Sequence, residues 1–156
     1  MAEKIPVGSD HAGYELKEEV LKYLVELGYE PEDYGASSPM SVDYPDIAAE
    51  VAGRVSRGES KRGILVCGAG IGMSIAANKY TGVRAALVLS EEMAELSRRH
   101  NDANVLALGG RITSVELARK IVKAWLELEF DGGRHAIRVA KIAESEKNND
   151  HLREKS

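Results

Sequence analysis

The chain has 156 residues, of which 44% are hydrophobic and 29% charged, and this composition is typical of a single globular domain with its own core. The net charge of −4 argues against broad binding to nucleic-acid phosphates, and no apolar run is long enough to span a membrane. No basic segment followed by an apolar one opens the sequence, and 1 Cys allows no internal disulfide, so we expect a cytoplasmic protein.

Strand-like and helix-like segments alternate along the sequence. In chain order, the pattern predicts a strand at 5–9, a helix ending at Gly28, a strand at 30–34, a helix from Pro45 to about Arg57, a strand at 63–67, a helix at 73–78, a strand at 85–89, a helix after Ser90, a strand at 105–108, a helix after Thr113 and a last helix after Gly133.

Capping residues support several of these boundaries. Gly28 and Gly58 are typical of helix ends, and Ser90 is suited to cap the helix that follows it. Thr113 and Glu116 match the spacing of a capping box, which predicts that the fifth helix begins at Thr113.

Five strands that alternate with helices predict an α/β fold, because right-handed crossovers make successive strands parallel. We expect a three-layer α/β/α sandwich with a doubly wound, five-stranded parallel sheet, a Rossmann-like architecture, in one domain at 1–146. A polar tail follows at 147–156, and 148–156 is expected to fray. Ligands of such sheets bind beyond the carboxyl ends of the strands, which nominates Asp10-His11, 67–72 and 109–111.

A glycine-rich turn follows the third strand at Gly68-Ala69-Gly70-Ile71-Gly72. Glycines let backbone amides face a bound anion, and the next helix adds a favourable field, so the turn is suited to hold an oxyanion. A plain tight turn is the alternative. The spacing differs from the dinucleotide fingerprint, and the lysine of a P-loop is absent, so NAD or ATP binding is a weaker reading.

Cys67 ends the apolar strand directly before this turn. Nearby amide groups can lower the pKa of a thiol, and a thiolate can act as a base or nucleophile. A buried cysteine can equally be a small core residue. The position of Cys67 beside the glycine turn favours the chemical role.

Two histidines are candidates for proton transfer, because imidazole exchanges protons near neutral pH. His11 follows the first strand beside Asp10, and His100 ends a helix beside Asn101. We place both histidines on the ligand side of the sheet. Each could instead satisfy a local hydrogen bond.

Arg134 and Arg138 are four residues apart and share one face of the last predicted helix. Two guanidinium groups on one face can clamp a phosphate. The alternative is a solvated basic face that includes Lys141.

Taken together, these motifs resemble the B-type ribose-5-phosphate isomerases, a family that includes galactose-6-phosphate isomerase subunits. The similarity runs from Ile5 to about Ile142, through Ser9-Asp10-His11-Ala12-Gly13, Asp43-Tyr44-Pro45, Cys67-Gly68-x-Gly70-Ile71-Gly72-Met73-Ser74, His100-Asn101-Asp102-Ala103-Asn104 and Asp131-Gly132-Gly133-Arg134-His135.

The resemblance implies an aldose-ketose isomerase of the non-oxidative pentose phosphate pathway, which interconverts ribose 5-phosphate and ribulose 5-phosphate without a metal or organic cofactor. Cys67 matches the base that moves a proton through a cis-enediolate, and His100 matches the residue that assists ring opening. The remaining positions match substrate contacts, which are Asp10, His11, Tyr44, Gly68, Ala69, Gly70, Ile71, Gly72, Asn101, Arg111, Arg134 and Arg138.

The resemblance also implies a homodimer or homotetramer whose active site is shared between subunits. Met73 stands where some members have a glutamate base, which leaves the cysteine route. Ala69 stands where the family commonly has Thr or Ser, whose hydroxyl relays a proton. The alternatives are therefore an isomerase of another sugar, such as galactose 6-phosphate, a tetrose phosphate or a sugar of the allose/psicose type, or a non-catalytic sugar-phosphate-binding subunit.

Overall fold

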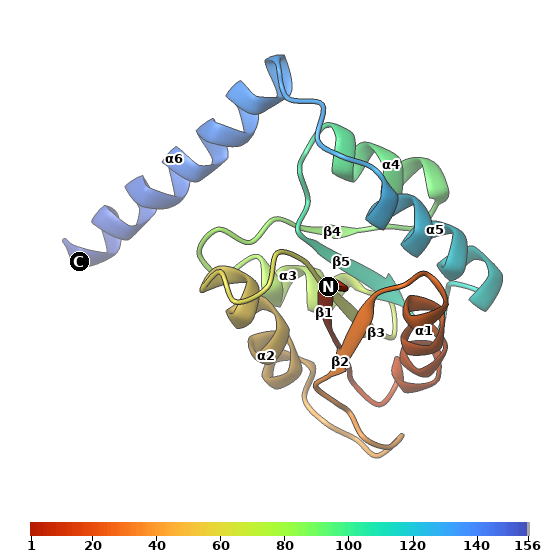
Figure 1. The fold of residues 1–156 in the computed structure, drawn as a ribbon. Helices are drawn as coiled ribbons and strands as arrows, with labels where there is room; N and C mark the ends of the chain where they lie inside the picture. Colours follow the sequence, from red (N-terminus) through yellow and green to blue (C-terminus); the bar gives the residue numbers. More distant parts are fainter. Residues whose placement is uncertain (156) are drawn as a thin grey trace.

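Five parallel strands form one sheet in the computed structural model, which describes residues 1–155 (Figure 1). The strand order is β2-β1-β3-β5-β4, so the chain winds outwards in both directions from β1 and β3. The strands are β1 (Lys4–Ser9), β2 (Glu30–Asp33), β3 (Gly63–Cys67), β4 (Ala85–Leu87) and β5 (Val105–Gly109).

Helices cover both faces of the sheet and complete the three layers that the sequence predicts. Helices α1, α4 and α5 pack on one face, and α2 and α3 pack on the other. The six helices of the described residues are α1 (Tyr14–Glu26), α2 (Tyr44–Ser56), α3 (Ile71–Ala77), α4 (Glu91–Arg99), α5 (Val115–Glu127) and α6 (Arg134–Glu154). The predicted α/β fold is confirmed. None of the described helices is both long and apolar enough to cross a membrane.

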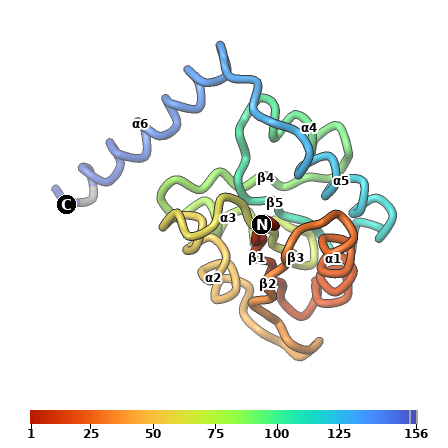
Figure 2. Tube along the Cα trace, viewed as in Figure 1, coloured from red at the N-terminus to blue at the C-terminus, as the bar shows by residue number. Residues whose placement is uncertain are grey.

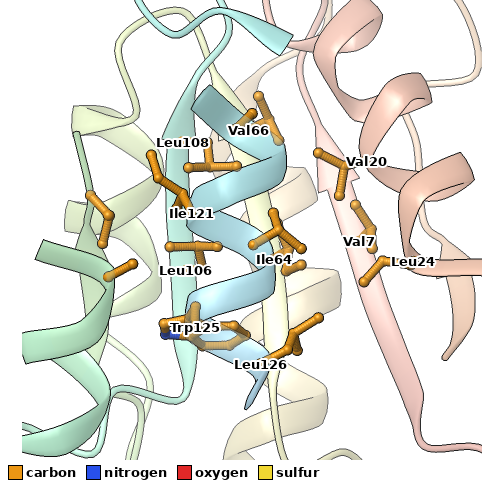
Figure 3. Packing of buried hydrophobic residues seen from close by; sticks show 14 of the residues in the cluster. Val7, Val20, Leu24, Ile64, Val66, Leu106, Leu108, Ile121, Trp125 and Leu126 are labelled. Atoms are coloured by element: carbon orange, nitrogen blue, oxygen red, sulfur yellow. The ribbon is translucent and has the colours of Figure 1, made fainter. Parts of the chain in front are cut away.

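The central strands are apolar because both of their faces are covered. Ile64 and Val66 of β3 point towards α1 and α5 and belong to the core cluster that includes Trp125 (Figure 3). Leu65 and Cys67 alternate to the other face and belong to the cluster under α2 and α3. The period-two alternation of β3 therefore divides the core into two parts and turns the Cys67 side chain towards α2 and α3.

Of the two predictions for residues that cap a helix start, one is confirmed and the other is wrong. The Oγ of Ser90 accepts a hydrogen bond of 3.1 Å from the Met93 amide and caps α4. For α5 the cap is Ser114, whose Oγ accepts a bond of 3.2 Å from Leu117 N–H. Thr113 instead donates its amide to the Gly109 carbonyl in the preceding turn, at 3.0 Å. The helix therefore begins one residue later than the capping box requires.

Helix α6 begins after Gly132 and Gly133 as predicted, and both glycines have positive φ. It lies apart from the sheet layers (Figures 1 and 2), and the Gly82 amide ties it to the loop before β4 by donating a 3.0 Å bond to Glu146 Oε1. The expectation that 148–156 frays is wrong for 148–154, because the helix runs on to Glu154. No Gly or Pro after 133 interrupts it.

Candidate functional site

Three loops meet at the carboxyl edge of the sheet, after β1, β3 and β5, and glycines allow their close contact. A Cβ at Gly13 would lie 2.6 Å from the Val66 carbonyl oxygen, and one at Gly110 would lie 2.8 Å from the Ala12 oxygen. The Gly110 amide donates a 2.7 Å bond to the carbonyl of Cys67. Backbone packing therefore fixes the position of the turn that follows Cys67.

The three glycines of the turn after β3 have different surroundings, and two of them leave no room for a side chain. Gly70 has φ +79°, and a Cβ there would lie 2.5 Å from Leu87 Cδ1. Gly72 lies under the ring of Tyr44, with 2.7 Å between a Cβ position and Cζ. Gly68 adjoins the Arg111 side chain, whose Nη1 would lie 3.5 Å from its Cβ. The turn leads directly into α3, whose first amides have no partner within the helix.

Cys67 is a free thiol at the end of β3 and is 5% exposed. It contributes to the core cluster under α2 and α3, as the alternative reading of a small core residue expects. It also lies directly before the turn of Gly68–Gly72, as expected if Cys67 acts as a base. The two readings are thus compatible, because a strand-end residue can pack on one side and face the site on the other.

Asp10 and His11 lie in the loop after β1 at the same edge. Asp10 is buried, and its Oδ1 accepts a 3.0 Å bond from Gly13 N–H, which closes the loop before α1. The Nδ1 of His11 accepts a 3.4 Å bond from the Val42 amide. In a neutral ring the proton is then on Nε2, which leaves His11 a hydrogen-bond donor for a ligand.

A buried lysine holds the loop that carries Val42 and leads to Tyr44 at the start of α2. Lys17 of α1 is 0% exposed, and its Nζ donates to Asp33 Oδ1 at 2.8 Å and to the Ala36 carbonyl. The Ala36 amide in turn donates to the Ser9 carbonyl at 2.7 Å. Lys17 thereby ties the start of this loop to the end of β1. This burial cannot be read from the sequence, because a lysine beside Glu18 in a helix gives no local signal of it.

His100 and Asn101 do not lie at this edge. Helix α4 starts at the carboxyl edge and runs antiparallel to the strands, so its end reaches the amino edge. The segment that follows confirms this position, because Asn104 N–H donates to the Arg84 carbonyl just before β4, and Gly63 N–H at the start of β3 donates to the Asn104 carbonyl. The placement of His100 on the same side as His11 is therefore wrong within one chain.

A second group of polar side chains surrounds His100 at the base of α6. The rings of His100 and His135 are stacked with centroids 4.1 Å apart and an interplanar angle of 9°. Partial burial lowers the pKa of His135, and the neighbouring His100, Arg134 and Arg138 lower it further. Arg134 and Arg138 are exposed on the first turns of α6.

The structure thus separates the predicted site residues into two groups. The carboxyl-edge group contains Asp10, His11, Tyr44, Cys67, Gly68, Ala69, Gly70, Ile71, Gly72 and Arg111, and the α6-base group contains His100, Asn101, Arg134 and Arg138. His135 and Asp131 belong to the second group and were not nominated as site residues. Both lie in the motif Asp131-Gly132-Gly133-Arg134-His135, which is the sequence signal that could have found them.

A cavity of about 600 Å³ at the amino edge is not the site, although three arginines line it. Arg62 donates to both carboxylate oxygens of Glu3, and Arg84 and Arg98 share the carboxylate of Asp102. Because carboxylates already occupy these guanidinium groups, we assign the cavity a structural role.

The fold and the carboxyl-edge group define an α/β protein with a thiol beside a glycine-rich turn. The model of the family described as Ribose/Galactose Isomerase matches residues 5–142. "Ribose-5-phosphate isomerase B" of Escherichia coli (strain K12) is 50% identical over 139 residues, which are 89% of this chain and 93% of that protein. "D-erythrulose-4-phosphate isomerase" of Pectobacterium atrosepticum is 41% identical over 151 residues, covering 94% of this chain and 97% of that protein.

The solved structures agree with the sequence comparisons. The structure of Clostridium thermocellum ribose-5-phosphate isomerase B is 54% identical, covers 94% of this chain and 99% of that one, and superposes with a TM-score of 0.91. The chain therefore belongs to the ribose/galactose isomerase family, and it is an isomerase.

Proposed function

We propose that this protein interconverts ribose 5-phosphate and ribulose 5-phosphate in the pentose phosphate pathway, with Cys67 as the base. The observation that carries the proposal is the position of the Cys67 thiol, which ends β3 directly before the glycine turn at the carboxyl edge. The names of the relatives from Escherichia coli and Clostridium thermocellum support the choice of substrate.

The proposed reaction moves protons and keeps every other atom in place. The Cys67 thiolate takes the proton from carbon 2 of the open-chain aldose, and the electron pair forms a cis-enediolate whose negative charge lies on oxygen 1. The thiol then returns its proton to carbon 1, while the hydroxyl proton of oxygen 2 passes to oxygen 1 and leaves a ketone at carbon 2. These transfers balance without a metal or organic cofactor.

The glycine turn is suited to stabilise the enediolate. Its backbone amides and the first amides of α3 are fixed before substrate binds, because Gly70 and Gly72 pack tightly against Leu87 and Tyr44. Preorganised amides lower the energy of a developing oxyanion without reorganisation in the transition state. We assign this role to Gly68, Ala69, Gly70, Ile71 and Gly72.

We further infer that the active site is shared between two chains. Ring opening by His100 and phosphate binding by Arg134 and Arg138 require contact with the substrate held at Cys67, but these residues lie apart in one chain. A two-fold dimer brings the α6-base group of each chain to the carboxyl-edge group of the other. The exposed side chains of Ile71 and Ile137, which are 54% and 63% exposed, offer apolar area for such an interface.

A tetrose phosphate is the second candidate substrate. Ala69 has no hydroxyl to relay the proton between oxygen 1 and oxygen 2, in contrast to the Thr or Ser common in the family. The relative from Pectobacterium atrosepticum carries the name of a tetrose-phosphate isomerase. A backbone amide or a water molecule then has to support the transfer on either substrate.

A substrate panel tests the proposal. We expect the purified protein to have its highest kcat/KM for ribose 5-phosphate, against D-erythrulose 4-phosphate, galactose 6-phosphate and allose. Cys67→Ser replaces the base by a much weaker one of similar size, so kcat should fall about 1,000-fold. The melting temperature of the variant should match that of the wild type. A higher kcat/KM for the tetrose phosphate, or full turnover by Cys67→Ser, contradicts the substrate or the base respectively.

The variant Ala69→Thr tests whether the missing hydroxyl limits the rate of isomerisation. If the missing hydroxyl limits proton relay, the rate with ribose 5-phosphate rises in this variant. An unchanged rate shows that the hydroxyl is dispensable in this protein. The matched control is Ala69→Val, which has nearly the same shape as Thr but no hydroxyl.

A further inference from the structure

Three side chains able to ligate a metal converge where the end of α4 meets the start of α6. They are His100, Asp131 and His135, and one ligand atom of each lies within 4.8 Å of the other two. The stacked imidazoles, with centroids 4.1 Å apart, hold two ring edges side by side. Among the described residues this is a group with two nitrogen donors and one carboxylate.

This donor set suits a zinc-class ion. Imidazole nitrogen and carboxylate oxygen bind Zn²⁺ at about 2.0–2.2 Å, so ligand atoms around one ion lie about 3.4 Å apart. The three ligand atoms lie within 4.8 Å of one another, so each has to move by about 1 Å to reach this spacing. Three protein ligands leave a fourth position open for water or another ligand, and Asp131 is exposed.

The carboxylate is itself held in position. Arg99 donates from Nε to Asp131 Oδ1 at 3.4 Å, and the Asp131 amide donates to the Arg99 carbonyl at 3.0 Å. Such outer contacts orient a ligating carboxylate and raise metal affinity. The positive charges of Arg134 and Arg138 act in the opposite direction. We therefore expect reversible binding that is weaker than that of a structural zinc site.

We propose that His100, Asp131 and His135 bind one divalent transition-metal ion per chain and that this ion inhibits the isomerase. An ion on the imidazole of His100 takes up the lone pair that this residue needs to move a proton. The ion is an inhibitor in this proposal and has no part in the isomerisation. Metal binding stands by itself, whereas inhibition rests on the proposed role of His100 in ring opening.

The experiment measures binding and activity separately on the full-length protein. Metal-free protein is titrated with Zn²⁺ in a calorimeter and with Co²⁺ in an absorption spectrometer, and isomerase activity is followed at the same metal concentrations. We expect one ion per chain, at least about 10-fold weaker binding in His135→Ala and in Asp131→Asn, and inhibition that tracks binding. Asp131→Asn keeps the shape of the side chain, so it still tests the ligand set if His135→Ala folds poorly.

Two matched controls separate this site from other metal ligands. His151→Ala removes the other imidazole of α6, which is exposed and paired with Glu154. Binding should be unchanged in His151→Ala and in Cys67→Ser. Unchanged binding in His135→Ala and Asp131→Asn, or a thiolate-to-cobalt absorption band that Cys67→Ser removes, overturns the proposed ligands.

Failure of the metal proposal is distinguishable from failure of the proposed function. If the cluster binds the ion with the expected variants but no sugar phosphate is turned over, the metal site stands and the function fails. If ribose 5-phosphate is isomerised and saturating Zn²⁺ leaves the rate unchanged, the function stands and the inhibition is refuted.

Discussion

The two groups of site residues are built in opposite ways. The carboxyl-edge group is a backbone structure in which glycines let loops approach to contact distance, and its thiol is 5% exposed. The α6-base group consists of side chains on the surface, stacked or exposed beside a helix that lies apart from the sheet (Figure 1).

This difference has a physical reason. An oxyanion is stabilised by dipoles that do not move, which backbone amides in a packed turn provide. A phosphate is held by long charged side chains, which need no such rigid support. The contrast between a rigid backbone site and an adaptable side-chain site leads to the following predictions.

The largest change in isomerase activity is expected when two inactive variants are mixed. Cys67→Ser damages only the carboxyl-edge group, and His100→Ala damages only the α6-base group. If the site is shared across a two-fold dimer, each mixed dimer contains one intact site, so subunit exchange restores about one quarter of wild-type activity. The measurement is activity after co-refolding, with each variant refolded alone as the control. Absence of recovery despite subunit exchange means that the two groups do not act across chains.

Glycine substitutions should cost more stability at the carboxyl edge than at the base of α6. Gly70→Ala forces φ +79° on an L residue and brings Cβ within 3.0 Å of the Leu108 backbone, so we expect a loss of about 3 kcal/mol. Gly133 has φ +56° with nothing within 4 Å, so Gly133→Ala should cost about 1 kcal/mol. Urea unfolding measures both values. If both variants lose the same free energy of unfolding, the carboxyl edge is no more rigid than the base of α6.

The arginine pair should affect substrate binding more than turnover. Removing one charge-assisted contact to phosphate costs about 1.5–3 kcal/mol, so Arg134→Gln and Arg138→Gln should each raise KM about 10–100-fold. Lys141→Gln is the matched control, because Lys141 is an exposed cation on the same helix. A similar rise in KM for all three variants indicates a general basic face, which is the alternative reading of these residues.

The smallest effect concerns the charge of His135. Its pKa is lowered from 6.5 by partial burial and by His100, Arg134 and Arg138, so the unfolded chain binds a proton at a higher pH than the folded chain. The free energy of unfolding contributed by His135 is therefore present above pH 6.5 and is lost as the pH falls through and below the folded pKa. NMR titration of His135 should show this pKa, and Arg138→Gln should raise it. A value at or above 6.5 contradicts the effect of the neighbouring charges.

Local patterns in the sequence were sufficient for most of the fold. The strand at 63–67 has the predicted bounds, because an unbroken apolar run between turn residues is typical of a buried parallel strand. The start of α6 follows from two glycines. The cap of α5 was placed one residue early, since Thr113 and Ser114 are both good capping residues and only the turn around Gly109 decides between them.

The site was predicted less completely than the fold. Cys67, Gly68–Gly72, Asp10 and Arg111 follow from the rule that ligands bind at the carboxyl ends of strands. The buried position of Lys17 depends on Asp33 and Ala36, which reach it only through the fold. The same is true of the stack between His100 and His135, which joins two helices far apart in the sequence.

The sequence by itself determined the α/β class, the order of the elements and the thiol beside a glycine turn, because these features depend on residues that are neighbours along the chain. Only the tertiary structure decided on which side of the sheet each candidate lies. Helix α4 reverses the direction of the chain, so His100 at its end and Cys67 at the end of β3 lie at opposite edges of the sheet. That separation is the physical reason to expect a second chain in the active site.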